Sequence, residues 1–251
     1  MDKQIENALL GRLIAMADDE LILAHRNSEW TGHAPILEED IALANLAQDE
    51  LGHATTIYGL VEQLNGRSPD NMAFFRDADE FRNAQLTELP KGDWAFTMLR
   101  QYLFDAYEHV LYTALLSSTH QPLADVVAKF KGEELYHLRH SHMWVERLGL
   151  GTAESQERTQ RALNQLWPFA LQLFRQMLGD EALIENNLFP DVTTLKESWE
   201  QIVIPHLEAC QLTIPTENIQ CICGRDTHTP NLAELLADMQ QVARWDPEAT
   251  W

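Results

Sequence analysis

The chain has 251 residues, among them 39 acidic and 18 basic side chains, so its formal net charge at pH 7 is −21. So acidic a chain repels the phosphates of nucleic acids and the headgroups of anionic membranes, which argues against both as partners. Only three cysteines are present, too few for a disulfide scaffold, and no run of about 18 apolar residues suggests a membrane-spanning helix. We therefore expect a cytoplasmic protein that binds neither nucleic acid nor membrane.

Four long segments with the apolar spacing of amphipathic helices fill the first 150 residues. Their expected ranges are 5–26, 36–64, 94–118 and 123–148. A polar, proline-containing stretch at 27–35 separates the first two, and residues 119–122 separate the last two. The link at 67–91 is long and polar, with a short helix expected around 77–86, and Gly92-Asp93 supplies the start signal for the next helix.

Two helical hairpins joined by one long connection follow the chain order of ferritin-like bundles, which have one long crossover. Further helices are expected near 154–178, 193–210 and 231–244, with an irregular stretch at 211–230. No alternation of β-branched residues indicates a strand. The sequence therefore predicts an all-α protein with a ferritin-like four-helix bundle, one long crossover and additional C-terminal helices. We expect residues 1–251 to form a single domain, with a bundle core at about 5–148 and a C-terminal helical extension at about 151–251.

The motif Glu-x-x-His occurs in the middle of the second expected helix and again in the middle of the fourth. Its i, i+3 spacing puts both side chains on one helix face, and each pair lies on the apolar stripe of its helix. The other two helices each carry one glutamate in an equivalent position. One Glu from each of two helices, with Glu-x-x-His from each of the others, is the ligand set of di-iron and di-manganese carboxylate bundles. The expected metal ligands are Glu20, Glu50, His53, Glu108, Glu134 and His137.

Carboxylate and imidazole ligands suit iron and manganese alike, so the sequence predicts a di-iron site with manganese as an alternative. Asp49 and Glu133 precede the two motif glutamates and offer carboxylates that can orient the ligand imidazoles. Asp105 is an alternative to Glu108 as the ligand from the third helix. Taken alone, any one of these acids is better explained as a solvated surface residue, since Glu is almost never buried unpaired. Their joint occurrence in bundle order is what favours a metal site.

Other motifs are weaker. Cys221-x-Cys223, with Cys210 and His228 nearby, fits no common zinc ribbon or finger, and free thiols or small core residues are the better interpretation. No phosphate-binding glycine loop, nucleotide fingerprint or nucleophile elbow is present, so no organic-cofactor site and no catalytic residue can be assigned. Because redox catalysis needs a reductant, an active metal site would depend on a separate reductase.

Several short segments resemble the C subunit of the bacterial phenylacetyl-CoA ring epoxidase, over nearly the full length of the chain. They are Glu-Trp-Thr-Gly-His-Ala-Pro at 29–35, Ile-Ala-Leu-Ala-Asn at 41–45, Arg-Gln-Tyr at 100–102, Asp-Ala at 105–106, Tyr-His-Leu-Arg at 136–139, Glu-Arg-Leu-Gly at 146–149 and Trp251. The resemblance implies a ferritin-like component of a multicomponent monooxygenase in aerobic phenylacetate breakdown. It also implies a paralogous A-type partner that holds the di-iron centre and epoxidises the ring of phenylacetyl-CoA, while the C-type component is structural and has often lost its ligands.

This sequence departs from that family pattern because both Glu-x-x-His motifs and both further glutamates are present. The leading hypothesis is a C-type subunit that supports the catalytic A-type subunit and retains a di-metal site of its own. A stand-alone di-iron oxygenase or ferroxidase is one alternative. A metal-free structural subunit is the other.

Overall fold

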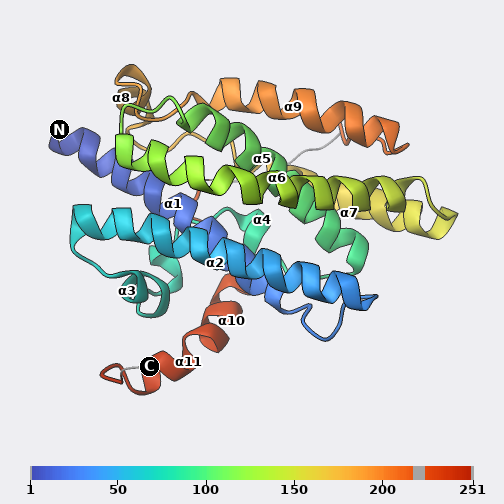
Figure 1. The fold of residues 1–251 in the computed structure, drawn as a ribbon, viewed down its shortest axis with the longest axis horizontal. Helices are drawn as coiled ribbons and strands as arrows, with labels where there is room; N and C mark the ends of the chain where they lie inside the picture. Colours follow the sequence, from blue (N-terminus) through green and yellow to red (C-terminus); the bar gives the residue numbers. More distant parts are fainter. Residues whose placement is uncertain (1, 217–223, 250–251) are drawn as a thin grey trace.

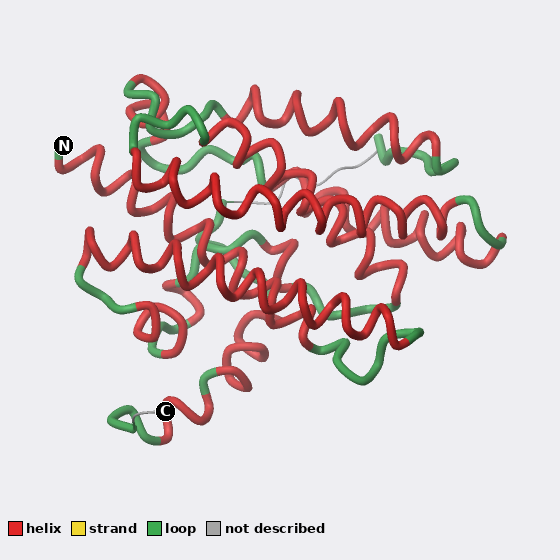
Figure 2. The backbone as a smooth tube through the Cα atoms, in the orientation of Figure 1, coloured by secondary structure: helices red, strands yellow, loops and turns green. Residues whose placement is uncertain are grey.

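The architecture is a set of packed helices, described by a computed structural model for residues 2–216 and 224–249 (Figure 1). Its four long bundle helices are α1 (Lys3–Ser28), α2 (Leu37–Asn65), α5 (Trp94–Leu115) and α6 (Gln121–Gly149). α1 packs along α2 and α5 along α6 as two hairpins, and α2 also contacts α6. Within the described residues there is no strand (Figure 2). The predicted all-α class and its ferritin-like arrangement are confirmed.

The ends of the bundle helices follow from local chemistry. Asp93 accepts a hydrogen bond from the backbone N–H of Phe96 and caps α5, as its position in the sequence predicts. Gly66, with a φ of 75°, ends α2 in the left-handed conformation that favours glycine. α1 extends to Ser28, so the expected end at residue 26 is too early. This difference matters because Asn27, expected in a loop, lies buried in the last turn of α1.

The long link between the hairpins contains three short helical segments, α3 (Pro69–Phe74), η1 (Ala78–Glu80) and α4 (Gln85–Glu88). The single short helix expected around 77–86 is therefore wrong in its bounds. Ser68 caps α3 through the backbone N–H of Asn71, and Pro69 occupies its first turn, where a fixed φ suits a helix start. That Ser-Pro signal is visible in the sequence and identifies the missed helix.

The C-terminal extension adds α7 (Ala153–Gln172), α8 (Asp180–Glu185), α9 (Val192–Ala209), α10 (Pro230–Met239) and α11 (Gln241–Trp245). α7 and α9 pack against α5, while α10 and α11 lie below α1 and α2 in Figure 1. The helix expected at 154–178 ends at Gln172 because the chain turns back at Gly179, which has a φ of 90°. A Cβ on Gly179 would lie 2.5 Å from the Cβ of Ala8, so the close approach of the turn to α1 also requires glycine.

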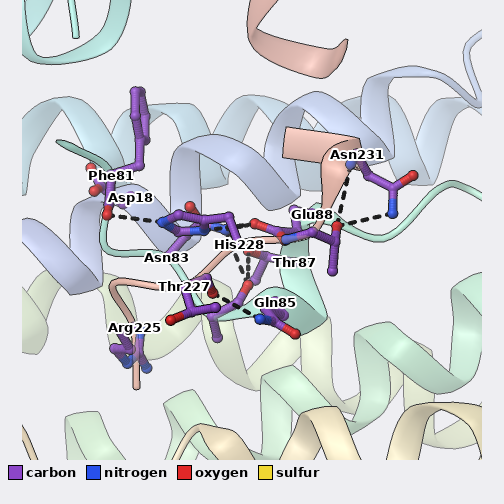
Figure 3. Close-up of polar contacts among 12 residues, drawn as sticks. Asp18, Phe81, Asn83, Gln85, Thr87, Glu88, Arg225, Thr227, His228 and Asn231 are labelled. Carbon is purple, nitrogen blue, oxygen red and sulfur yellow. Dashed lines mark hydrogen bonds and ion pairs between the residues drawn. The ribbon is translucent and has the colours of Figure 1, made fainter. Parts of the chain in front are cut away.

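Partly buried polar contacts tie the segment before α10 to the link between the hairpins (Figure 3). His228 lies 2.9 Å from Glu88 through Nδ1 and donates through Nε2 to the carbonyl of Phe81, at 3.0 Å. Burial alone would lower the pKa of His228, but its hydrogen bonds to Glu88 and Phe81 raise it. Gln85 donates to the carbonyl of Thr227 at 2.7 Å. The segment before α10 is therefore fixed on the link between the hairpins.

Among the four bundle helices, α5 has the largest share of buried residues, because α6, α7 and α9 pack against it. Most of its residues are buried, including polar ones such as Arg100, Gln101, Asp105 and Glu108. Buried polar groups need partners, so this helix determines which polar groups meet inside the bundle. In the described residues no helix is both long enough and apolar enough to cross a membrane.

Candidate metal centre

Three consecutive acids of α1, Asp18, Asp19 and Glu20, are all buried and point to different neighbours. Asp18 forms an ion pair with Arg76, and Asp19 forms one with Arg225 at 2.6 Å. Glu20 has no arginine or lysine partner among the described ion pairs, and it faces His53 of α2 instead. Asp18 and Asp19 thus form buried ion pairs that hold other segments against α1, whereas Glu20 points toward His53 inside the bundle.

Glu20, His53 and Glu134 form the closest group of potential metal ligands. His53 Nδ1 lies 3.3 Å from Glu20 Oε1 and 3.2 Å from Glu134 Oε1. One ligand atom from each of the three residues lies within 4.8 Å of the other two, and all three side chains are buried. Three of the predicted ligands, from three different helices, are therefore brought together.

His137 and Glu108 lie beside this group. His137 Nδ1 is 3.5 Å from Glu134 Oε1, and the His53 and His137 ring centroids are 6.3 Å apart, so Glu134 contacts both imidazoles. The Tyr112 hydroxyl lies 2.5 Å from Glu20 Oε1 and 2.9 Å from Glu108 Oε1. Tyr112 has one hydrogen to donate, so one of the two carboxyl groups carries a proton. Burial, reinforced by the charges of Glu134 and Glu20, raises the pKa of Glu108 well above its usual range, which makes Glu108 the protonated one.

Glu50, the sixth predicted ligand, is engaged differently. Asn27 donates to both Glu50 oxygens at 3.0 and 2.9 Å, and Gln101 donates to Oε1 at 2.9 Å. Gln101 also donates to Asp105, which accepts a further bond from Ser141. Asp105 and Glu108 therefore both face the site, and each has its own set of contacts.

The outer nitrogens of the two histidines bind the predicted orienting carboxylates in a crosswise manner. His53 of α2 lies 2.8 Å, through Nε2, from Glu133 of α6. His137 of α6 lies 3.2 Å, through Nε2, from Asp49 of α2. A proton held on Nε2 leaves the Nδ1 lone pair of a neutral imidazole directed into the bundle, which is the arrangement that a metal ligand needs.

Without a bound cation, burial and neighbouring charges favour the protonated forms of several acids and of both histidines at the site. Burial raises the pKa of Glu50 to about 8 and that of Asp105 to about 7. Burial would lower the pKa of both histidines, but the carboxylates around them raise it to about 11 for His53 and about 12 for His137. The positive histidines in turn lower the pKa of Glu134 against the effect of its burial. The two imidazolium groups thus supply positive charge at the positions next to Glu134.

Several buried atoms of this group have no hydrogen-bond partner within the described part of the chain. They are Glu20 Oε2, His53 Nδ1, both oxygens of Glu134 and His137 Nδ1. His53 Nδ1 and His137 Nδ1 lie at ion-pair distance from Glu134 Oε1, so Glu20 Oε2 and Glu134 Oε2 are the atoms with neither a hydrogen bond nor an ion pair among the described residues. An unsatisfied buried polar atom costs about 1–3 kcal/mol, and two such oxygens beside two imidazoles indicate a group that binds there. Oxygen and imidazole donors suit a divalent transition metal. The residues therefore fit a metal ion, with Glu20, His53 and Glu134 as the ligands that lie closest together.

The sequence analysis gave Asn27, Gln101 and Ser141 no place at the site, and it assigned no role to Tyr112. Gln101 and Tyr112 could have been found, because they lie on one face of α5 with Asp105 and Glu108, at spacings of four, three and four residues. Asn27 was expected in the stretch at 27–35 between the first two helices, and Ser141 was not singled out.

The alternative zinc cluster receives no support from its described members. Cys210 is a buried free thiol whose Sγ lies 3.7 Å from His206 Nε2, while His228 pairs with Glu88. Cys221, Cys223 and Trp251 lie outside the described residues.

Comparison with known proteins identifies a family and two relatives. A family model described as phenylacetic acid catabolic protein matches residues 1–251. The chain is 39% identical over 247 residues to the C subunit of 1,2-phenylacetyl-CoA epoxidase from Escherichia coli (strain K12), covering 98% of this chain and 100% of that relative. It is 25% identical over 224 residues to the A subunit of the same enzyme, covering 87% of this chain and 72% of that relative. Two components of one enzyme are thus similar to this chain, the C-type component more so than the A-type component.

Proposed function

Because the chain belongs to the phenylacetic acid catabolic protein family, we propose that it is the C-type subunit of a phenylacetyl-CoA epoxidase complex in aerobic phenylacetate catabolism. In this proposal it assembles in the cytoplasm with a paralogous A-type subunit, and a separate reductase supplies electrons. The observation that carries the proposal is the 39% identity to the C-type relative, which extends over 98% of this chain and the whole of that relative. The weaker similarity to the A-type relative supports a partner with a related fold.

We further propose that this chain retains a di-metal carboxylate site, with iron as the expected metal and manganese as the alternative. The residues proposed to hold it are Glu20, Glu50, His53, Glu108, Glu134 and His137. A bound iron pair would supply redox chemistry that side chains cannot provide. The support for this site is the set of buried ligand atoms without hydrogen bonds described above.

The surrounding residues have roles that follow from their contacts. Glu133 and Asp49 hold the Nε2 protons of the two histidines and so keep each Nδ1 directed inward. Tyr112 donates to Glu20 and fixes the position of that carboxylate. The Phe130 ring stacks on His53 with centroids 3.9 Å apart, which excludes water from that side of the imidazole.

The described grooves are in line with a supporting role for this chain. Five grooves with volumes from about 130 to about 420 Å³ lie along α5, α7, α9 and the neighbouring loops. None of these five grooves is lined by a proposed metal ligand. A substrate as large as phenylacetyl-CoA therefore reaches none of the ligands through them, which supports assigning the epoxidation to the A-type subunit.

The test is co-expression of this chain with the A-type subunit, followed by purification of the complex and turnover assays with phenylacetyl-CoA and reductase. We expect a stable complex that turns over substrate. We also expect turnover to survive in the variants His53→Ala and His137→Ala, because the reaction takes place in the partner. Matched variants of the partner's own metal ligands should abolish it.

Two outcomes would overturn parts of this proposal. If His53→Ala or His137→Ala abolished turnover in an intact complex, this chain would have a catalytic role. If the chain formed no complex and oxidised ferrous iron or an organic substrate without its A-type partner, it would be a stand-alone oxygenase or ferroxidase.

A further inference from the structure

The predicted ligand atoms fall into two groups that differ in hydrogen bonding. In the first group, Glu20 Oε2, both Glu134 oxygens and the Nδ1 atoms of His53 and His137 have no hydrogen-bond partner among the described residues. In the second group, every carboxylate oxygen of Glu50 and Asp105 accepts at least one hydrogen bond. The first group is open to a cation, whereas the second is occupied by protein donors.

The side-chain amides of Asn27 and Gln101, referred to here as the amide pair, cause this difference. Asn27 Nδ2 donates to Gln101 Oε1 at 2.8 Å as well as to Glu50, so the two amides also hold each other. Gln101 Nε2 donates to Glu50 and, at 2.7 Å, to Asp105. The side chains of Asn27, Gln101, Glu50 and Asp105 are all buried. If an amide donor lost its carboxylate acceptor, water could not easily take the place of that acceptor.

We infer that the two metal positions are unequal: one divalent ion binds at Glu20, His53 and Glu134, and the amide pair opposes a second ion at His137. The inference rests on the proposed function, because it concerns the same retained site. The ligands of the first ion therefore come from α1, α2 and α6.

The physical reason is a competition for the oxygens of Glu50 and Asp105. A second ion beside His137 shares Glu134 with the first and needs further oxygens from these two acids. Those oxygens would have to turn away from buried amide hydrogens, which would then have no acceptor. At the first position Glu20 Oε2 and both Glu134 oxygens accept no hydrogen bond among the described residues, so they can turn to an ion without leaving a buried amide donor unpaired. Tyr112 holds only the other oxygen of Glu20, and the Nδ1 proton of His53 leaves when the ion binds.

The test uses Mn²⁺ alone, titrated calorimetrically into the full-length, metal-free chain at about 0.15 M salt, which screens weak binding to the acidic surface. We expect one ion per chain to bind at least about tenfold more tightly than any other ion. Electron paramagnetic resonance of the loaded protein should show isolated Mn²⁺ rather than a magnetically coupled pair. His53→Ala should abolish the tight ion, whereas His137→Ala should leave its affinity within about threefold.

The amide pair itself is tested by Asn27→Asp, which keeps the side-chain shape but replaces donors with an acceptor. This variant should bind a second Mn²⁺ at least about tenfold more tightly than the original chain does. Two ions of equal affinity in the original chain would overturn the inequality and leave the proposed di-metal site standing. Absence of any tight Mn²⁺ would overturn both. Equal losses in His53→Ala and His137→Ala would overturn the inequality even if Asn27→Asp failed to fold.

Discussion

Two sides of α1 bury acidic side chains in opposite ways. On one side, Asp18 and Asp19 meet the guanidinium groups of Arg76 and Arg225, so each negative charge has a permanent positive partner. On the other side, Glu20 faces histidines and further carboxylates, and one of its oxygens has no hydrogen bond among the described residues. Burial alone does not identify a ligand. The two sides differ in how the negative charge is balanced. Asp18 and Asp19 are balanced by arginines of the chain, whereas Glu20 has an unbonded oxygen that a cation can bind.

The largest expected effect comes from removing Asp18, one of the two acids that are paired with an arginine. Asp18→Ala removes the partner of the buried Arg76 guanidinium and should lower the free energy of unfolding by about 3–5 kcal/mol, measured by urea denaturation. A change at the metal centre, Glu108→Gln on α5, should cost less than about 1 kcal/mol, because a protonated carboxyl group is replaced by an amide of similar shape. Equal losses of unfolding free energy in the two variants would show that the arginine-paired acids and the acids of the metal centre do not differ as described.

The next largest effect is the stabilisation of the chain by Mn²⁺ bound at the metal centre. Saturating Mn²⁺, at a concentration of about 100 times its dissociation constant, should stabilise the chain by about 2.7 kcal/mol and raise its melting temperature. Glu134→Ala should abolish this shift, because Glu134 contacts both imidazoles. Glu133→Ala, a change at the exposed neighbouring carboxylate, should only weaken Mn²⁺ binding, by about 10- to 100-fold. A shift that persists in Glu134→Ala would place the ion elsewhere.

The dependence of metal binding on pH sharpens the same comparison. The raised pKa of His53, about 11, means that this ligand of the first ion holds a proton near neutral pH in the absence of metal. Metal binding must displace protons from its ligands, so Mn²⁺ affinity should rise by about tenfold per pH unit for each proton released. Titration at about pH 6 and about pH 7 measures the slope. A flat response would contradict the protonated site.

The smallest effect comes from the contact that holds the C-terminal segment. The pKa of His228 is raised in the folded state by Glu88 and Phe81, so its stabilisation is complete below the unfolded value of about 6.5. That stabilisation is lost as the pH rises through the higher folded-state pKa. His228→Ala should therefore cost about 1 kcal/mol at acidic pH and less at alkaline pH, by urea denaturation. His33→Ala, in an exposed turn, is the control for loss of an imidazole and should change the free energy of unfolding by less than about 0.5 kcal/mol.

The sequence predicted the bundle well because helical periodicity is a local signal. The apolar stripe of α1, including Leu9, Leu13 and Met16, is buried as expected, and the four long helices occur where they were predicted. Glu20, Glu50 and Glu134 could be placed on inward faces for the same reason, and all three are buried. Whether they bind metal stays a prediction.

The contacts that distinguish one acid from another could not be predicted, because they join residues far apart in the chain. The partner of Asp19 is Arg225, which lies in a stretch expected only to be irregular. The bond from Asn27 to Gln101 spans 74 positions, and an error of two residues at the end of α1 was enough to hide it. Periodicity shows which face of a helix is inside, whereas the identity of the neighbour depends on how the helices pack.

The most direct test of the central claim is anomalous diffraction from crystals of this chain grown with Mn²⁺. We expect the strongest anomalous peak to lie between the side chains of Glu20, His53 and Glu134. Peaks confined to surface carboxylates, with none among these three side chains, would contradict it.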